Sequence, residues 1–248
     1  MLGKNMQNFF SLHRCTPGGA PLTLGRKLNE LFLVLLVLIS LTLVIWLSDA
    51  DRRLSALVFF PQQEWPGLED PFWQWVYTWG PLPAWICGLA ALVVMVAGIW
   101  WQRLRGLRRQ GLFLLLLLVI GPGLVTNVLL KDNLGRPRPR EVVEFGGEHR
   151  FHQFWQPGDA GANSSFPSGH ASIAFAMIGP WFLVRGRNRI PADRFLVVGL
   201  GWGVLVGAAR ILQGGHFLSD TLWAGGVVYL TAQLLAIWLK PEQDDPLP

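Results

Sequence analysis

Six long apolar runs, separated by polar stretches, dominate the pattern of residues along the chain. They predict helices at residues 31–47, 82–101, 112–130, 168–184, 195–212 and 222–239. Each run is close to the roughly 20 residues that a helix needs to cross the hydrocarbon core of a bilayer. The expected fold class is therefore all-α: a polytopic membrane protein with six transmembrane helices.

The polar segments around these runs predict the domain organisation. Residues 1–30 are polar and mildly basic and are expected to form a cytoplasmic tail, residues 31–240 a six-helix membrane domain, and residues 241–248 a second cytoplasmic tail. The first run is too long for the apolar core of a secretory signal and is followed by no small-residue cleavage site. It is therefore expected to remain as a membrane helix.

Two local features modify this pattern. The segment 49–80 is rich in Trp and acidic residues, which suits the headgroup level of a membrane, but it could instead form a packed external subdomain. Gly121, Pro122 and Gly123 interrupt the third run. Proline lacks a backbone N–H and its ring clashes with the preceding turn, so this helix should kink.

Composition and charge agree with a membrane protein. Hydrophobic residues make up 51% of the chain, charged residues 15%, and the net charge is +5. Most basic residues follow the second run (Arg103, Arg105, Arg108, Arg109) or the fourth (Arg185, Arg187, Arg189, Arg194). This distribution fits the positive-inside rule better than nucleic-acid binding, and it places both loops and both termini in the cytoplasm. The only cysteines, Cys15 and Cys87, exclude a disulfide framework or a cysteine metal site.

Three motifs fall on the opposite, external face, which would be the periplasm if the membrane is a bacterial inner membrane. They are residues 131–139 (KDNLGRPRP), 167–170 (PSGH) and 210–220 (RILQGGHFLSD). The second opens an apolar run with Pro, Ser and Gly, so it predicts a helix start whose free N–H groups attract anions. The site is therefore expected at the external ends of the helices.

These residue types suit metal-free phosphoryl transfer. The reaction needs a nucleophile, an acid for the leaving oxygen and positive charge around the phosphate. The sequence contains no evident metal-ligand cluster and implies no cofactor, so the charge is expected from Lys131, Arg138 and Arg210. The hydroxyl of Ser168 and the amide of Gly169 would complete a phosphate cradle.

The spacing of the last motif suggests how the nucleophile is held. His216 and Asp220 are four residues apart, so on a helix they share a face. A carboxylate on one ring nitrogen fixes the tautomer and frees the other to attack, which makes His216 the predicted nucleophile and Asp220 its orienter. His170 is the predicted acid and later base. The alternatives are an interfacial hydrogen bond and snorkelling basic anchors; His149 and His152 are interpreted as solvated loop residues.

In the order and spacing of the three motifs the chain resembles the type 2 phosphatidic acid phosphatase (PAP2) family. The family pattern is Lys, six residues, Arg-Pro; then Pro-Ser-Gly-His; then Ser-Arg, five residues, His, three residues, Asp. The chain departs from it at Ala209, where the family usually has Ser, and we expect a tuned site instead of an inactive one. The resemblance implies a lipid phosphatase with a phosphohistidine on His216.

Two further arginines flank Arg138. Arg136 and Arg140 could bind a second phosphate or an acidic headgroup, or lie on a solvated, proline-stiffened loop, and the solvated loop is favoured. The resemblance admits undecaprenyl diphosphate, phosphatidylglycerol phosphate, phosphatidic acid and lipid A as substrates. Residues 144–147 and 163–165 are similar to bacterial lipid A phosphatases of the family.

Other functions remain open at this point. A phosphotransferase would pass the same phosphohistidine to a lipid acceptor, and a transporter of anionic lipids would use intramembrane basic residues, more naturally at mid-bilayer. A vanadate-binding haloperoxidase shares the family's site, but those relatives are soluble. The expected partners are a lipid phosphate and membrane lipids, and the oligomeric state is open.

Overall fold

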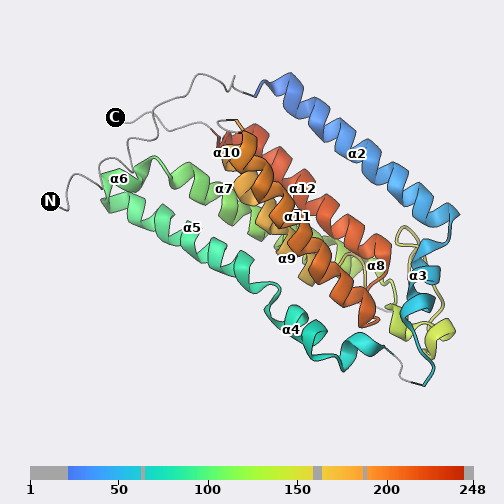
Figure 1. Ribbon diagram of the computed structural model, residues 1–248. Helices are drawn as coiled ribbons and strands as arrows, with labels where there is room; N and C mark the ends of the chain where they lie inside the picture. Colours follow the sequence, from blue (N-terminus) through green and yellow to red (C-terminus); the bar gives the residue numbers. More distant parts are fainter. Residues whose placement is uncertain (1–21, 63–64, 159–163, 187–188, 243–248) are drawn as a thin grey trace.

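A computed structural model describes residues 22–62, 65–158, 164–186 and 189–242. This part of the chain is all-helical and contains no β-strand apart from one isolated bridge between Val142 and His149. Its elements in chain order (Figure 1) are α2 (Leu24–Leu47), α3 (Ala50–Val58), η1 (Pro66–Leu68), α4 (Pro71–Trp79), α5 (Leu82–Trp100), α6 (Gln102–Arg105), α7 (Arg108–Leu118), η2 (Val119–Lys131), α8 (Asp132–Leu134), η3 (Pro139–Glu141), η4 (Val143–Phe145), α9 (Gly169–Phe175), η5 (Ala176–Ile178), α10 (Gly179–Val184), α11 (Arg189–Leu212) and α12 (Leu218–Leu239).

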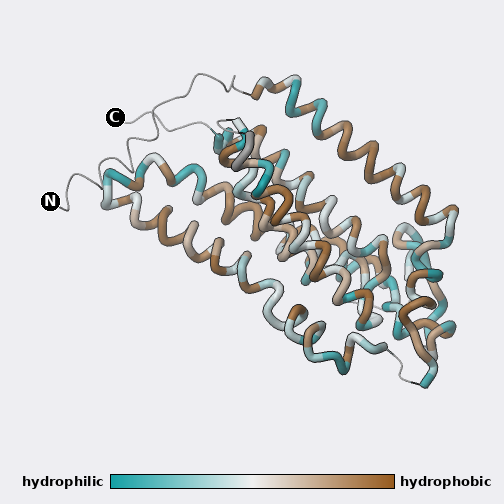
Figure 2. The backbone as a smooth tube through the Cα atoms, viewed as in Figure 1, coloured by the Kyte–Doolittle hydropathy of each residue, from teal (hydrophilic) through white to brown (hydrophobic). Residues whose placement is uncertain are grey.

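Five helices in the described ranges are long and apolar enough to cross a membrane. They span 24–47, 71–100, 108–141, 192–212 and 218–239. Figure 2 shows hydrophobic residues along the middle of these helices and hydrophilic residues toward their ends. Many large apolar side chains on α2 and α5 are exposed, which suits contact with lipid tails. The protein is therefore an integral membrane protein.

The remaining predicted run, at 168–184, differs from the other five. It is helical but short, and it is divided into α9, η5 and α10. The prediction of six crossings therefore rests on this segment and stays a prediction. Residues Arg187, Cys15 and Asn163, to which the sequence analysis gave a role, lie outside the described residues.

Helix α2 begins earlier than the apolar pattern suggested, because its first charged residues have partners in the bundle. Thr23 caps the helix, so residues 24–30, which the sequence analysis assigned to the tail, are part of α2, and the tail itself stays a prediction. Lys27 is buried, and its Nζ lies 2.5 Å from Oε1 of Glu242. Glu242 is a residue that the sequence analysis assigned to the C-terminal tail. Glu30 pairs with Arg185, at 3.0 Å. These pairs hold α2 against the bundle.

The core of the bundle surrounds α9, η5 and α10. Phe113 and Leu117 of α7 and Val228 of α12 pack with Phe175 and Phe182 in one buried cluster. Small residues let the helices approach closely: a Cβ on Gly203 of α11 would lie 2.1 Å from the Phe175 ring. The segment that begins with the PSGH motif is therefore held from several sides.

The expected interruption of the third helix takes the form of a π-helical stretch, η2. Pro122 lies within this stretch, and the side-chain amide of Asn127 donates to the Pro122 carbonyl at 2.6 Å. Such stretches occur where the regular ladder of hydrogen bonds is broken. Lys131, the first predicted phosphate ligand, is the last residue of η2.

The predicted motifs gather at one end of the bundle, which we call the α3 end (Figure 1). The starts of α9 and α12, the end of η2 and the segment 49–80 all lie there. Elements α3 and α4 contact α11, and Trp65 packs with Val142, Phe145 and Phe217 in a buried cluster. The packing of α3 and Trp65 fits the packed subdomain, whereas Trp75 and Trp79 of α4 are exposed within the candidate span 71–100, as the membrane-interface interpretation expects, so both interpretations of segment 49–80 stay open.

Candidate active site

A polar cavity of about 280 Å³ opens at the α3 end. It is lined by residues from four separate parts of the chain: Leu68, Gln74, Tyr77, Lys131, Arg138, Arg140, His170, Arg210, Gln213 and His216. Both predicted catalytic histidines and three predicted phosphate-binding cations are among them. The structure thus brings these residues together, although up to 148 positions separate the first from the last.

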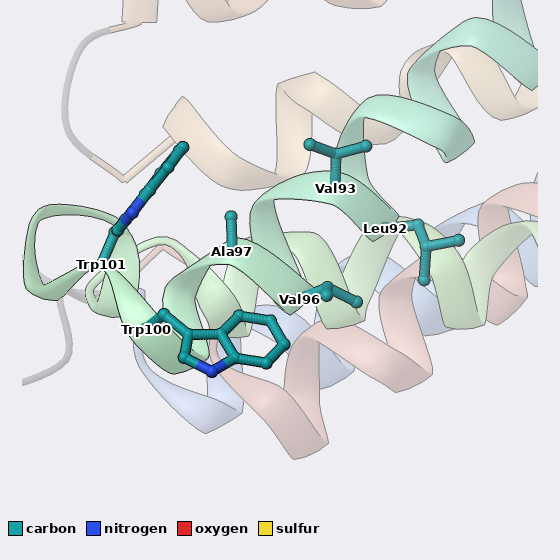
Figure 3. A pocket seen from close by; sticks show the side chains of 6 residues that line it. All are labelled: Leu92, Val93, Val96, Ala97, Trp100 and Trp101. Carbon is teal, nitrogen blue, oxygen red and sulfur yellow. The ribbon is translucent and has the colours of Figure 1, made fainter.

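A second hollow, on α5, has a different character. It is lined only by apolar and aromatic side chains near the α6 end of the helix: Leu92, Val93, Val96, Ala97, Trp100 and Trp101 (Figure 3). None of these groups can donate or accept a proton at neutral pH in phosphoryl transfer. This hollow suits lipid contact, and the polar cavity is the candidate active site.

The PSGH motif forms one wall of the site. The Ser168 hydroxyl is fully buried and has no hydrogen-bond partner among the described residues, whereas the Ser168 N–H donates to the Asp220 carbonyl at 3.2 Å. A Cβ on Gly169 would lie 2.8 Å from Asn127 Oδ1 and 3.7 Å from Lys131 Nζ. Only glycine therefore fits here without displacing its neighbours, and an orphaned buried hydroxyl points to a polar ligand.

His216 is held with one ring nitrogen engaged. Its Nδ1 lies 2.6 Å from the Ser165 carbonyl and 3.7 Å from Asp220 Oδ2, and only 2% of the residue is exposed. Nδ1–H therefore donates to the Ser165 carbonyl, which leaves the lone pair on Nε2. Burial lowers the pKa of His216 to about 4, although the neighbouring Asp220 acts in the opposite direction. The imidazole is neutral at physiological pH, as a nucleophile requires.

His216 and Asp220 were expected to pair, but the distance between their side chains is longer than a hydrogen bond. Asp220 is fully buried, and its Oδ2 accepts from the Phe217 N–H at 2.7 Å. Its Oδ1 accepts from Arg136 at 2.5 Å. Asp220 therefore supplies negative charge beside the His216 ring, while the Ser165 carbonyl supplies the direct acceptor.

Arg136 corrects one prediction. It is completely buried, where the sequence suggested a solvated loop or a headgroup contact. Its guanidinium pairs with Asp51 at 2.8 Å and with Asp220, and its Nε donates to the His152 carbonyl at 2.9 Å. These partners lie far away in the sequence, so no local pattern could reveal them. Arg140, by contrast, is exposed and lines the cavity.

Arg210 is clamped between neighbours that the sequence analysis did not select. Its Nη1 donates to Gln213 at 2.5 Å, and its guanidinium lies 4.5 Å above the Tyr77 ring. A Cβ on Gly215 would come within 2.3 Å of Arg210 Nη2. The Tyr77 ring also packs against His170, with 4.6 Å between centroids and an angle of 31° between the ring planes. The aromatic cluster of segment 49–80 was the signal available for Tyr77.

The first motif contributes through its backbone as well as its side chains. The Arg138 N–H donates to Glu141 at 2.8 Å, which forms a turn at η3, and the Lys131 carbonyl accepts from Ser164 at 3.1 Å. The loop histidines His149 and His152 are half-buried, where solvated side chains were expected. The arrangement places cations, a neutral imidazole and a second histidine around one cavity.

A comparison of the sequence with models of known protein families identifies the family of this chain. The model of the PAP2 superfamily matches residues 111–244, which is more than half of the chain and includes all three motifs. The chain belongs to the PAP2 superfamily. The resemblance inferred from the motifs is therefore confirmed.

Three curated PAP2 relatives carry the name lipid A 4'-phosphatase. The relative from Francisella tularensis subsp. novicida is 36% identical over 127 residues, which are 50% of this chain and 55% of the relative. Those from Rhizobium leguminosarum and Rhizobium etli are 33% and 34% identical over 123 residues, 47% of this chain and 50% and 46% of the relatives. The chain thus spans about half the length of the curated relatives it matches. No solved structure matches.

The departure from the PAP2 pattern at Ala209 lies behind the cavity wall. Ala209 is fully buried in an apolar cluster with Val76, Ala174 and Val206, and it does not line the cavity. A hydroxyl at this position would not reach a phosphate in the cavity directly. Within the described residues, no three His, Cys, Asp or Glu side chains lie close enough to hold a metal ion.

Proposed function

We propose that this protein is a lipid phosphatase that hydrolyses a phosphate ester through a phosphohistidine on His216, without a metal ion. The observation that carries the proposal is the cavity itself. It places neutral His216 and a second histidine, His170, beside Lys131, Arg138 and Arg210. PAP2 membership supports the same class of reaction.

In the first step, Nε2 of His216 attacks phosphorus, and the bond between phosphorus and the lipid oxygen breaks. Burial and the cations Arg210 and Lys131 disfavour a proton on His170 in the empty cavity, whereas the negative charge of a bound phosphate favours it; protonated His170 then gives its proton to the departing lipid oxygen. The His216 ring becomes positive, and its Nδ1–H continues to donate to the Ser165 carbonyl beside the Asp220 carboxylate. These two oxygens stabilise the charge that develops on the ring.

In the second step, water replaces the enzyme on phosphorus. His170, now neutral, takes a proton from the attacking water, and the bond between phosphorus and Nε2 breaks. Inorganic phosphate leaves, and His216 returns to its neutral form. His170 therefore serves as acid and then base, and no group needs to be supplied from outside.

Fixed positive charge stabilises the phosphoryl group in both steps. Lys131, Arg138 and Arg210 line the cavity, and the Gly169 amide and the Ser168 hydroxyl, which has no hydrogen-bond partner in the described part of the chain, complete the cradle. Such preorganised donors need no rearrangement when charge develops, and removing one typically costs about 100- to 1000-fold in kcat.

The position of the cavity supports a lipid substrate. It lies at the α3 end of apolar helices, so an acyl tail can remain in the bilayer while a headgroup reaches the histidines. The names of the curated relatives make the 4'-phosphate of lipid A the first substrate to test. We propose that α9, η5 and α10 form a sixth crossing, which places this end outside the cytoplasm and both termini inside.

Phosphate release by the purified protein in detergent tests the proposal. The substrates are lipid A, undecaprenyl diphosphate, phosphatidylglycerol phosphate and phosphatidic acid, each with EDTA present. His216→Ala should reduce release by about a thousandfold or more, because the covalent step is lost. His149→Ala, a histidine outside the cavity, is the matched control and should retain activity.

The outcomes separate the candidate functions. Release that resists EDTA and disappears in His216→Ala supports the phosphatase and ranks the lipids. Transfer of labelled phosphate to a lipid acceptor, with little free phosphate, would identify a phosphotransferase instead. Release that is unchanged in His216→Ala, or absent with every lipid, would reject the proposed function.

A further inference from the structure

Three buried charged side chains are linked in series behind His216, the candidate nucleophile. The first of them lies outside the region matched by the PAP2 model. Asp51 lies on α3, Arg136 follows η2, and Asp220 is in the first turn of α12. The exposed fractions of these three side chains are 2%, 0% and 0%. Burial of three charged groups is costly unless each is paired, so the arrangement must be specific.

Arg136 bonds to both residues whose oxygens surround Nδ1 of His216, at other atoms of those residues. Its guanidinium donates to Asp220 Oδ1 at 2.5 Å, and its backbone carbonyl accepts from the Ser165 N–H at 2.8 Å. Ser165 and Asp220 are the residues that lie 2.6 Å and 3.7 Å from that nitrogen. One residue thus fixes the two groups that orient the His216 ring.

Asp51 fixes the other side of the same assembly. Its Oδ2 accepts from Arg136 Nη2 at 2.8 Å and from the Ser219 hydroxyl at 2.6 Å. Its Oδ1 accepts from the Ser219 N–H at 2.8 Å. Ser219 directly precedes Asp220, so Asp51 holds the first turn of α12 as well as the guanidinium.

The charges of Asp51, Arg136 and Asp220 also affect the electrostatic environment of His216. Two carboxylates share one guanidinium, so the assembly retains one net negative charge beside the ring. The charged groups that face His216 are Asp220 from α12, Arg210 from α11 and Lys131 from η2. Arg136 shares its positive charge between Asp51 and Asp220. The negative charge of Asp220 is therefore compensated less fully than in an ion pair between one carboxylate and one guanidinium.

We infer that Asp51 and Arg136 are positioning residues, which orient the His216 ring and set the negative charge beside it through Ser165 and Asp220. The inference deepens the proposed function and rests on the role given there to His216. It assigns a part in the site to α3, which lies outside residues 111–244.

The main test uses Asp51→Asn, which keeps the shape of the side chain and removes its charge. We expect kcat to fall about tenfold with KM within twofold of wild type, as for other groups that orient a catalytic ligand. Because Arg136 then pairs with Asp220 alone and one negative charge is lost, the acid limb of the kcat profile should move to lower pH. Arg136→Gln removes the positive charge, so it should move the limb to higher pH.

Glu30→Gln is the matched control. It also removes a carboxylate that ties the N-terminal helices to the bundle, through Arg185, but it lies near the start of α2, at the other end of that helix from α3. If Asp51 only docked α2 and α3, Glu30→Gln would lose as much kcat as Asp51→Asn. We expect Glu30→Gln to keep both kcat and the acid limb.

A second measurement does not depend on activity. Labelling of the histidine Cε1 carbons gives five signals in the NMR spectrum, and His216→Ala assigns one of them. The pKa of His216 measured in this way should fall in Asp51→Asn and stay unchanged in Glu30→Gln. If Arg136→Gln does not fold, this comparison alone decides.

The outcomes distinguish the two proposals. A wild-type protein that releases no phosphate, but whose His216 pKa falls in Asp51→Asn, would reject the phosphatase and keep the coupling. An active wild-type protein whose His216 pKa and kcat are unchanged in Asp51→Asn would overturn the inference about Asp51 and Arg136. Equal losses of kcat in Asp51→Asn and Glu30→Gln would also overturn it.

Discussion

Tyr77 offers the sharpest test of the site's geometry. This α4 residue packs against His170 in a tilted arrangement, with 4.6 Å between ring centroids, and its ring centroid lies 4.5 Å from the Arg210 guanidinium. It therefore positions the proposed general acid and one proposed phosphate ligand at the same time. Tyr77→Ala removes both contacts, whereas Tyr77→Phe keeps the ring and removes only the hydroxyl.

The expected loss follows from the two contacts. A ring pair of this kind is worth about 1 kcal/mol beyond the area it buries. The cation–π contact contributes about 1 kcal/mol when it is partly desolvated. Together they amount to about 2 kcal/mol, which corresponds to a roughly thirtyfold loss of kcat/KM in Tyr77→Ala. Tyr77→Phe should remain within about threefold of wild type, because the ring is kept.

The assay is initial-rate phosphate release across a range of lipid concentrations, with kcat and KM fitted separately. Tyr229→Ala is the matched control, since Tyr229 is the only other tyrosine and packs against Trp181 and Phe182 in the core. It should reduce thermal stability and leave kcat/KM unchanged in the folded fraction.

Two results would refute this reasoning. If Tyr77→Ala stayed within twofold of wild type, the ring contacts of Tyr77 with His170 and Arg210 would have no part in catalysis. If Tyr77→Phe lost as much as Tyr77→Ala, the hydroxyl and not the ring would be the important group.

Three further predictions follow from the structure. Burial lowers the pKa of His216 from 6.5 to about 4, and the attacking form is neutral, so kcat should persist at pH 5 and fall only as pH approaches 4; an acid limb near 6.5 in a kcat profile would contradict this. Arg140→Ala removes an exposed cation from the cavity mouth and should raise KM more than it lowers kcat, with a larger effect on diphosphate than on monophosphate lipids; equal effects on both would exclude a second phosphate contact. Lys27→Ala removes one half of the buried Lys27–Glu242 ion pair, so it should lower the free energy of unfolding by about 3 kcal/mol without altering kcat/KM, as measured by thermal and kinetic assays; an unchanged melting temperature would show that the pair is not stabilising.

The site was largely predictable because its chemistry is local in the sequence. The spacing of residues 131–139, 167–170 and 210–220, combined with an even number of expected crossings, placed them on one face, and the cavity contains residues from each. The exact partner of His216 was not predictable in this way. Asp220 is four residues away, but the Ser165 carbonyl, at 2.6 Å, is 51 residues away.

Arg136 and Arg140 show where local patterns stop being informative. Both are arginines of one proline-rich loop, and the sequence treated them alike. One is fully buried between carboxylates of α3 and α12, and the other is exposed at the cavity. The environment of Arg136 depends on carboxylates that folding brings from 84 and 85 positions away.

The sequence by itself determined the helices, the membrane class and the residue types of the site. Apolar runs must be buried or face lipid, and a helix satisfies its own backbone, so these features follow from nearest neighbours along the chain. Only the tertiary structure decided which polar groups lie in the interior. Asp51 and Tyr77 entered the site because α3 and α4 fold back onto α11 and α12, where a buried charge finds partners and a ring finds a cation. Such pairings depend on distance in space, for which separation in the sequence is no guide.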